Sequence, residues 1–466
     1  MTSPTTGQPR RALVTGATGY VGSQVAAALL EDGWAVRALS RSRAKAEAMA
    51  YADAIVPEGE TAGAGQLEVV EGDASEREDV ARALADVDVA WYLLHSMSGG
   101  DFVAAEREMA QTFAEEAAAA DVDRIVYLGG LHPAGEELSD HLRSRVEVGE
   151  ILLNSGVPTA ALQAGVVLGD GSSSFTLLRH LSERLPGAIG PIWIGNSITP
   201  IAARDAVHFL VAAADLDPGL NRTFDVGGPD TLSYAEMMQR YSRAVGLPPH
   251  PIVIAPVATP HLATHWMALI TPIGPGLLEP LLGSLLHDTV VKERDLEALV
   301  GVPEGGLLSF EEAVRAATAD IDTRRWVRLF GTVAGLVAAG ALTETALERR
   351  SGARPGRLRL AARAGLSFDL AWQTSLVIGD LVEKDRNNDL PAYASLGALA
   401  VALQAVRPLA QAPGRPRWLG LLAGAGAALS LGEVVRHTWA HRSQRGVLLT
   451  PVAAVAAGEL VGAWRR

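Results

Sequence analysis

The first 320 residues alternate short apolar runs with longer stretches in which apolar and polar positions recur with a helical period. Apolar runs lie at residues 12–14, 35–39, 69–70, 89–94, 124–128, 159–168 and 223–226. Alternating strands and helices are typical of a doubly wound α/β fold with a parallel sheet. We therefore predict a domain of this class over residues 11–320, with a smaller subdomain over about residues 170–320.

The pattern changes at about residue 324, where long Ala-, Leu-, Gly- and Val-rich stretches replace the alternation. Five stretches lie near residues 326–347, 365–382, 391–410, 418–435 and 447–464. A helix needs about 20 residues to span a bilayer. Tryptophans mark many of their ends, as in an interfacial aromatic belt: Trp326, Trp418, Trp439 and Trp464. We expect an all-α transmembrane helical bundle over residues 324–466. The alternative is a soluble Ala-rich bundle, since Asp369, Gln373 and Asp380 lie inside one stretch.

Arginines limit the topology of this bundle. Five spans would place the arginine-rich loop at residues 349–363 outside, against the tendency of basic loops to stay in the cytoplasm. With four spans the first stretch lies at the interface, the loop at residues 383–389 is outside and both termini are inside. We expect a multi-pass protein of the cell membrane, in contact with the lipid bilayer, whose N-terminal domain is cytoplasmic.

Composition supports this division. The chain of 466 residues has a formal net charge of −13, yet residues 321–466 hold 19 Lys and Arg against 10 Asp and Glu. The acidic first part is a poor candidate for nucleic acid, which needs clustered cations. The chain has no cysteine, which excludes thiolate metal sites. Residues 1–10 are polar and are expected to form a disordered tail.

A glycine-rich turn follows the first apolar run. Gly16, Gly19 and Gly22 separate residues 12–14 from the helical run 25–30. Such a strand, turn and helix lets the backbone approach a pyrophosphate at the helix N-terminus. The second apolar run ends in Ser40, Arg41, Ser42 and Arg43. Arginine at that place suits a 2′-phosphate, so NADP(H) is favoured over NAD(H) as cofactor.

The motif Thr-Gly-Ala-Thr-Gly-Tyr-Val-Gly at residues 15–22 resembles that of extended and atypical short-chain dehydrogenases/reductases, including NmrA-like proteins and the nucleotide-binding accessory subunit of respiratory complex I. The resemblance spans roughly residues 10–315. It implies a Rossmann domain and a set of cofactor-binding positions. These positions are Gly16, Thr18, Gly19, Tyr20, Val21, Gly22, Ser40, Arg41, Arg43, Asp73, Ala74, Leu94, His95, Gly129, Gly130, Arg145, Ala164 and Val166.

The chain departs from this group at the residues that carry out the reaction in its members. The Tyr-x-x-x-Lys pair that the resemblance implies is absent, and His141 and Arg145 have the same four-residue spacing. His141 is our candidate proton donor and Arg145 our candidate ribose contact; the alternative is a surface histidine and an arginine paired with a nearby glutamate. Gly129 and Gly130 also replace a hydroxyl residue, so oxyanion stabilisation would need His132, Ser96 or backbone N–H groups.

Three further features concern the substrate, a metal site and the end of a helix. Residues 251–291 are rich in proline and large apolar side chains, which indicates either an entry channel for a lipophilic molecule or packing against the bundle. His261 and His265 lack a third ligand, so no metal site is expected. Asp205 is expected to be a helix N-cap.

The sequence thus predicts NADPH-dependent reduction of a lipophilic quinone, isoprenoid or lipid carbonyl. The alternative is a non-catalytic NADPH-binding scaffold or a redox-sensing protein of a membrane assembly. The sequence does not determine the oligomeric state.

Overall fold

The computed structural model describes residues 9–95, 102–133, 135, 138–184, 188–247, 252–254, 267 and 271–324. The chain divides into two compact units, the first formed by residues 1–264 and 271–321. The five predicted membrane stretches lie outside the described residues. Within the described residues, no helix has the length and apolar character that a membrane crossing requires.

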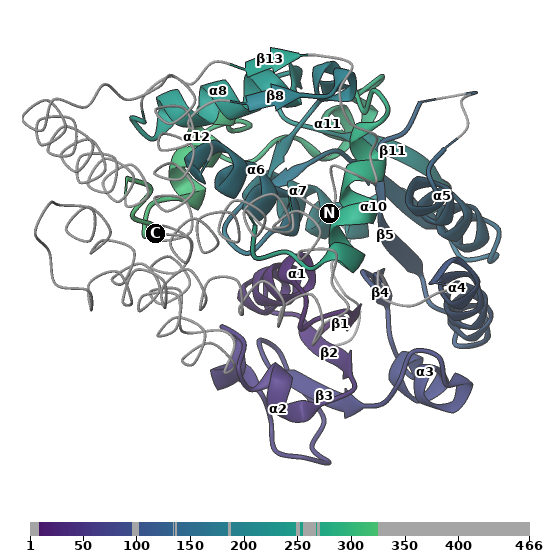
Figure 1. The fold of residues 1–466 in the computed structure, drawn as a ribbon. Coiled ribbons are helices and arrows are strands. Elements are labelled where there is room, and N and C mark those ends of the chain that lie inside the picture. Colours follow the sequence, from purple (N-terminus) through teal and green to yellow (C-terminus); the bar gives the residue numbers. More distant parts are fainter. Residues whose placement is uncertain are drawn as a thin grey trace, which may run out of the picture. The chain divides into compact units, whose positions relative to one another are not determined.

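A parallel sheet forms the centre of the first unit (Figure 1). Its seven strands run in the order β11-β6-β5-β4-β1-β2-β3, and every neighbouring pair is parallel. The strands are β1 (Arg11–Thr15), β2 (Ala35–Ser40), β3 (Leu67–Glu71), β4 (Val89–Tyr92), β5 (Arg124–Gly130), β6 (Thr159–Ala164) and β11 (Arg222–Val226). The strand order reverses between β1 and β4, so the crevice for a ligand lies there, at the carboxyl ends of the strands.

Helices cover both faces of this sheet because the strands are apolar on both sides. One core joins the sheet to α1 (Tyr20–Glu31) and α7 (Ala203–Ala212), with Val25, Leu29 and Phe209 fully buried. The other joins it to α3 (Arg77–Leu84), α4 (Phe102–Ala119) and α5 (Asp140–Leu153). The predicted doubly wound α/β fold is confirmed for this part of the chain.

The later elements form a smaller group beside the sheet. They are the helices α6 (Ser173–Arg184), α8 (Tyr234–Ala244), α10 (Pro275–Leu285) and α12 (Phe310–Ala317), with short strands β7 (Val167–Leu168), β8 (Ala188–Gly190), β9 (Ser197–Ile198), β10 (Ile201–Ala202), β12 (Leu232–Ser233) and β13 (Ile252–Ile254). The helix α11 (Asp295–Val300) instead packs on β11 and α7, and its Leu296 belongs to the core of the sheet. Short helical turns lie at α2 (Arg43–Ala46), η1 (Ala52–Ala54), η2 (Ile192–Gly195) and η3 (Ala213–Asp215).

One sequence-based assignment, at the start of α7, is wrong. Ala202 rather than Asp205 is the N-cap of α7, and no side chain caps that helix end. The buried Asp205 carboxylate instead accepts hydrogen bonds from the Leu308 backbone N–H and from Arg204, both at 2.8 Å. Asp205 therefore ties α7 to the segment that leads into α12, because a buried carboxylate needs such partners.

Candidate functional site

The turn between β1 and α1 has the close geometry that its glycines predict. Gly16 has φ +70°, and a Cβ there would lie 2.6 Å from the Leu93 carbonyl oxygen. A Cβ on Gly22 would lie 2.2 Å from the carbonyl oxygen of Gly16. The Gly19 N–H closes the turn by donating to the Gly16 carbonyl at 2.8 Å. No larger residue fits at Gly16 or Gly22 without moving the backbone.

The start of α1 has the properties of an anion site. Its N-cap is Gly19, no side chain accepts a hydrogen bond from its first turn, and that turn holds no acidic residue. The free N–H groups and the helix dipole therefore suit the pyrophosphate of a dinucleotide. Tyr51, which the sequence did not single out, donates from its hydroxyl to the Ala17 carbonyl at 3.0 Å and braces the turn.

Three predicted cofactor residues contact other parts of the protein. The Tyr20 ring packs against the turn at Gly169 and Gly171, where an added Cβ would lie 1.9 Å and 2.9 Å from its atoms. The Arg43 guanidinium pairs with Glu47 at 2.8 Å and donates to the Val56 carbonyl at 2.7 Å. The Asp73 carboxylate accepts hydrogen bonds at 3.0 Å from the N–H and the hydroxyl of Ser75.

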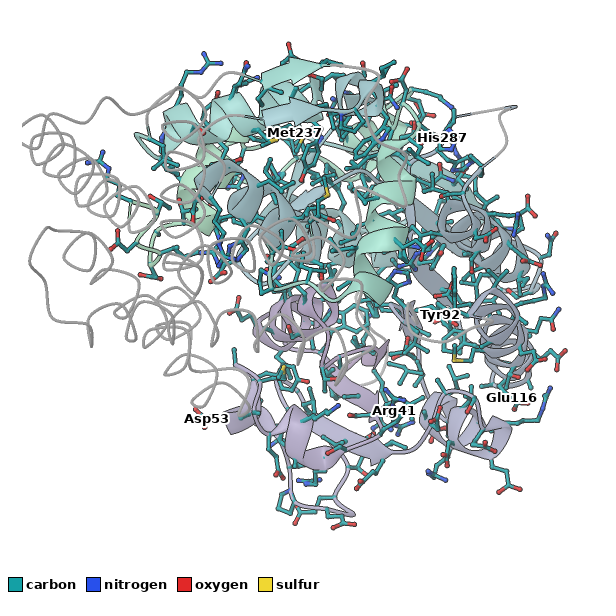
Figure 2. The ribbon with its side chains drawn as sticks, in the orientation of Figure 1. Arg41, Asp53, Tyr92, Glu116, Met237 and His287 are labelled. Carbon is teal, nitrogen blue, oxygen red and sulfur yellow. The ribbon has the colours of Figure 1, made fainter. Side chains whose placement is uncertain are left out.

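Arg41 has a different environment. It follows the last residue of β2, beside the end of β3, and its side chain is exposed (Figure 2). Within the described residues, no hydrogen bond or ion pair is found for its guanidinium. Ser40 holds the turn by accepting from the Ser42 N–H at 3.3 Å and donating to the Ser42 carbonyl at 3.0 Å. Arg41 is thus the cation at this place that stays available to a ligand.

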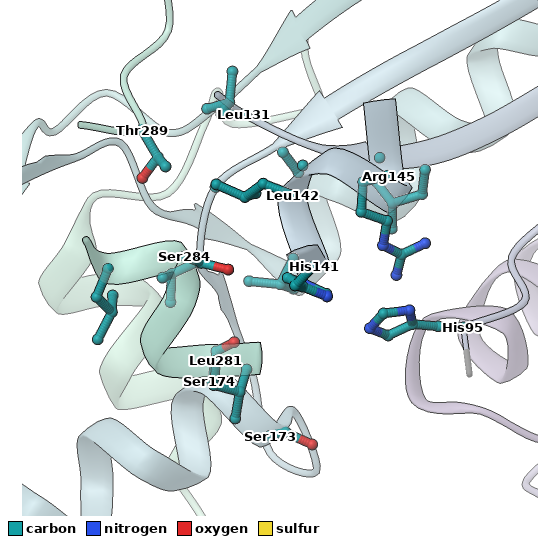
Figure 3. A pocket seen from close by; sticks show the side chains of 18 of the residues that line it. His95, Leu131, His141, Leu142, Arg145, Ser173, Ser174, Leu281, Ser284 and Thr289 are labelled. Carbon is teal, nitrogen blue, oxygen red and sulfur yellow. The ribbon is translucent and has the colours of Figure 1, made fainter. Parts of the chain in front are cut away.

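A cavity of about 220 Å³ lies at the carboxyl ends of β4, β5 and β6 (Figure 3). His95 follows β4, Gly129 and Gly130 end β5, and His141 and Arg145 project from α5. The remaining lining residues come from β5 and the segment after it, from α5, from β6, β7 and the link between them, and from α6, α8, α10 and the segment after α10. They are Leu128, Leu131, Leu142, Ala164, Gly165, Val166, Val167, Ser173, Ser174, Leu177, Tyr234, Leu281, Ser284, Leu285 and Thr289.

The fold therefore brings together most of the residues that were predicted to surround the nicotinamide. Gly165 approaches the backbone so closely that a Cβ there would lie 2.4 Å from the Thr199 carbonyl oxygen. Arg145 donates to the Leu94 carbonyl at 3.5 Å, not to Glu147; Glu147 pairs with Arg107 of α4. Because Gly129 and Gly130 carry no side chain, a planar ring can lie against the backbone of β5.

His141 is only partly exposed, and its surroundings oppose a positive charge. Its Nδ1 atom is buried without a hydrogen-bond partner. Burial, then the Arg145 guanidinium, lowers the pKa of His141 to about 3. The imidazole is therefore neutral at pH 7.

The His95 ring contacts the carboxylate of a buried glutamate. Its Nδ1 atom lies 3.1 Å from Oε1 of Glu106, a residue of α4 that is 4 % exposed. The other carboxylate oxygen accepts a hydrogen bond from the Ser144 hydroxyl of α5. Glu106 was not predicted from the sequence, although a signal was present. Glu106 lies on the buried stripe of α4 with Ala110 and Phe113, where a charged residue needs a partner.

Of the two side chains named for oxyanion stabilisation, only His132 lies in the described part of the chain. His132 points its Nδ1 atom at the Gly130 carbonyl, at 3.2 Å, and is not among the lining residues. Ser96 lies outside the described residues. No group of three or more His, Cys, Asp or Glu side chains in the described part of the chain could hold a metal ion.

Comparisons with known proteins agree with this geometry. A family model described as NAD(P)H-binding matches residues 16–151. A curated relative, (4-alkanoyl-5-oxo-2,5-dihydrofuran-3-yl)methyl phosphate reductase of Streptomyces griseus, is 27 % identical over 237 residues, which are 51 % of this chain and 74 % of the relative. The N-terminal part of the chain is therefore a NAD(P)-binding Rossmann domain that is similar to a reductase.

Two solved structures are similar to this chain, and the first of them illustrates the fold. Triphenylmethane reductase of a Citrobacter species has a TM-score of 0.51 and 18 % identity, over 66 % of this chain and 99 % of its own. UDP-glucuronic acid 4-epimerase of Bacillus cereus, solved with UDP-glucuronic acid and NAD, has a TM-score of 0.49 and 15 % identity, over 66 % and 98 %. At these identities the likeness concerns the fold.

Proposed function

We propose that this protein is a NAD(P)H-dependent reductase that transfers a hydride to an apolar substrate with a carbonyl group, such as a quinone, an isoprenoid or a lipid aldehyde. The observation that carries the proposal is the cavity beside Gly129 and Gly130. It combines two histidines and one arginine with a wall of leucines and valines. Mostly apolar pockets with a few convergent polar groups are typical of small-molecule sites.

Different residues of the site would bind the cofactor and exclude water from the substrate. When bound, the reduced nicotinamide supplies the hydride. The uncapped N-terminus of α1 would hold the pyrophosphate, and Arg145 would hold the nicotinamide ribose. The apolar side chains of α6 and α10 would exclude water from the substrate. Leu177, Leu281 and Leu285 form this part of the wall, and each is buried or partly buried.

We assign NADP(H) as the preferred cofactor on the basis of Arg41. Its exposed guanidinium follows β2, where the ribose of the adenosine half lies in this fold. A guanidinium matches a phosphate better than it matches a hydroxyl, because it donates several N–H groups and carries a charge.

We also propose that residues 324–466 place this reductase in the cell membrane with the Rossmann domain in the cytoplasm. Support comes from the apolar stretches, their flanking tryptophans and the arginine-rich loops. A substrate dissolved in the bilayer would account for the apolar wall of the cavity.

The competing function is a scaffold that binds the cofactor without using it. The absence of the Tyr-x-x-x-Lys pair favours this alternative, as does the neutral state of His141. The two functions predict different fates for bound NADPH.

Consumption of NADPH by the full chain in detergent separates the two functions. We expect NADPH absorbance to fall with menadione, decanal or farnesal, and deuterium from labelled NADPH to appear in the product. Arg145→Met should reduce the rate at least about 10-fold through misplaced cofactor. The control Arg143→Met changes an exposed arginine of the same helix that pairs with Asp140. Tight NADPH binding without consumption would instead support the scaffold.

A further inference from the structure

The Glu106–His95 pair fixes which ring nitrogen of His95 can meet a substrate. Burial alone would raise the pKa of Glu106, but hydrogen bonds from His95 and Ser144 lower it to about 2. Glu106 is therefore an anion, and an anionic carboxylate can only accept hydrogen bonds. The proton between the two groups thus belongs to Nδ1 of His95. Its Nε2 atom is left for the cavity that His95 lines.

His141 lacks this support. Its ring centroid lies 5.0 Å from that of His95, so both rings reach the same part of the cavity (Figure 3). However, among the described residues no carboxylate hydrogen-bonds to His141, and its Nδ1 atom is buried without a partner there. A neighbouring anion favours the protonated form of a buried imidazole, because it stabilises the charged ring.

The groups that act on His95 have opposite effects. Burial and the Arg145 guanidinium of α5 lower the pKa of His95, while Glu106 of α4 raises it, with a result of about 4. Among the described residues, the other titratable group that faces His95 is His141, which is neutral. Protonation of His95 therefore costs free energy at neutral pH, and the imidazolium that forms releases its proton readily.

We propose that His95, oriented by Glu106, gives the proton to the substrate oxygen. This inference rests on the proposed reductase function. The carbonyl carbon accepts a hydride from the reduced nicotinamide, and the electron pair of the C=O π bond moves to the oxygen. The oxygen takes the Nε2 proton of the His95 imidazolium, which becomes neutral, and a proton from solvent restores it. Glu106 is a positioning residue, since it acts through His95.

The pH dependence of reduction follows from this scheme. Since the reacting form is protonated, kcat/KM with decanal or menadione should fall about 10-fold for each pH unit between pH 5 and 8. His95→Gln should lower kcat/KM at pH 6 by about 100-fold or more and abolish the slope. Glu106→Gln should lower it about 10-fold, since the imidazolium loses its anion. His141→Gln should keep the slope.

Glu147→Gln is the matched control for Glu106→Gln. Glu147 also joins α4 to α5, through Arg107, but it is partly exposed and does not line the cavity. Its substitution should leave the rate and the pH profile unchanged. Retained NADPH affinity in each variant shows that the domain is folded.

A second readout needs no turnover. In the cofactor-free protein labelled with ¹⁵N-histidine, NMR should show a His95 ring protonated at Nδ1 at pH 7. The Glu106→Gln substitution should lower the pKa of His95 further, while Glu147→Gln should not change it. A His95 ring protonated at Nε2 would contradict the proposal, as would NADPH consumption that His95→Gln retains. If the wild-type chain consumes no NADPH with any probe, the proposed function fails as well.

Discussion

At the scale of single residues, the choice of cofactor depends on one exposed arginine. Arg41 has an unengaged guanidinium among the described residues, whereas Arg43 is held by Glu47 and the Val56 carbonyl. The Arg41→Ala substitution removes a charge-assisted contact of about 1.5–3 kcal/mol with a 2′-phosphate. We expect the affinity for NADPH to fall about 10- to 100-fold and that for NADH to stay the same, measured by fluorescence titration of each cofactor.

Arg43→Ala serves as the comparison because it removes an equal charge two residues further along the chain, near the same end of β2. Its guanidinium is already occupied, so NADPH affinity should change much less than in Arg41→Ala. Equal losses in the two variants would mean that the local positive potential, and not a specific contact of Arg41, attracts the phosphate. An unchanged preference in Arg41→Ala would remove the assignment of NADP(H).

At the scale of elements, the approach of α1 to β1 depends on Gly22. An added Cβ would lie 2.2 Å from the Gly16 carbonyl oxygen, which is backbone and cannot turn away. In Gly22→Ala the start of α1 must shift from the turn, so NADPH affinity should fall at least about 10-fold. Gly276→Ala in α10 is the control, because a Cβ there meets nothing within 4 Å. Unchanged affinity in Gly22→Ala would mean that the cofactor does not bind at this turn.

The same elements show what sequence can and cannot predict. The strand β5 covers residues 124–130 and contains the apolar run at residues 124–128, because a strand buried on both faces is largely apolar. The wall formed by α10 could not be foreseen, since Leu281 and Leu285 reach the cavity from 128 and 132 residues beyond Leu153, the last residue of α5. The pairing of Glu106 with His95 was not predicted. His95 was named only as a cofactor-binding position, and the place of Glu106 on the buried stripe of α4 indicates that it needs a partner but not which one.

At the scale of the whole molecule, charge and hydropathy divide the chain into two parts. Residues 321–466 hold 19 Lys and Arg against 10 Asp and Glu, while the chain as a whole has a net charge of −13. Arginine-rich loops between apolar stretches are typical of the cytoplasmic side of a membrane protein. The Rossmann domain and the C-terminus of the basic part, residues 321–466, can therefore both lie in the cytoplasm only if the number of spans between them is even.

The position of Asn388 tests this topology directly. Four spans, with the stretch at residues 326–347 at the interface, place the loop at residues 383–389 outside, whereas five spans place it in the cytoplasm. We expect a reporter that is active only outside the cytoplasm to be active when fused after Asn388 and inactive when fused after Arg363. Activity of the Arg363 fusion alone would establish five spans. Release of the full chain from membranes by alkaline carbonate would contradict insertion altogether, because apolar spans of about 20 residues stay in the bilayer.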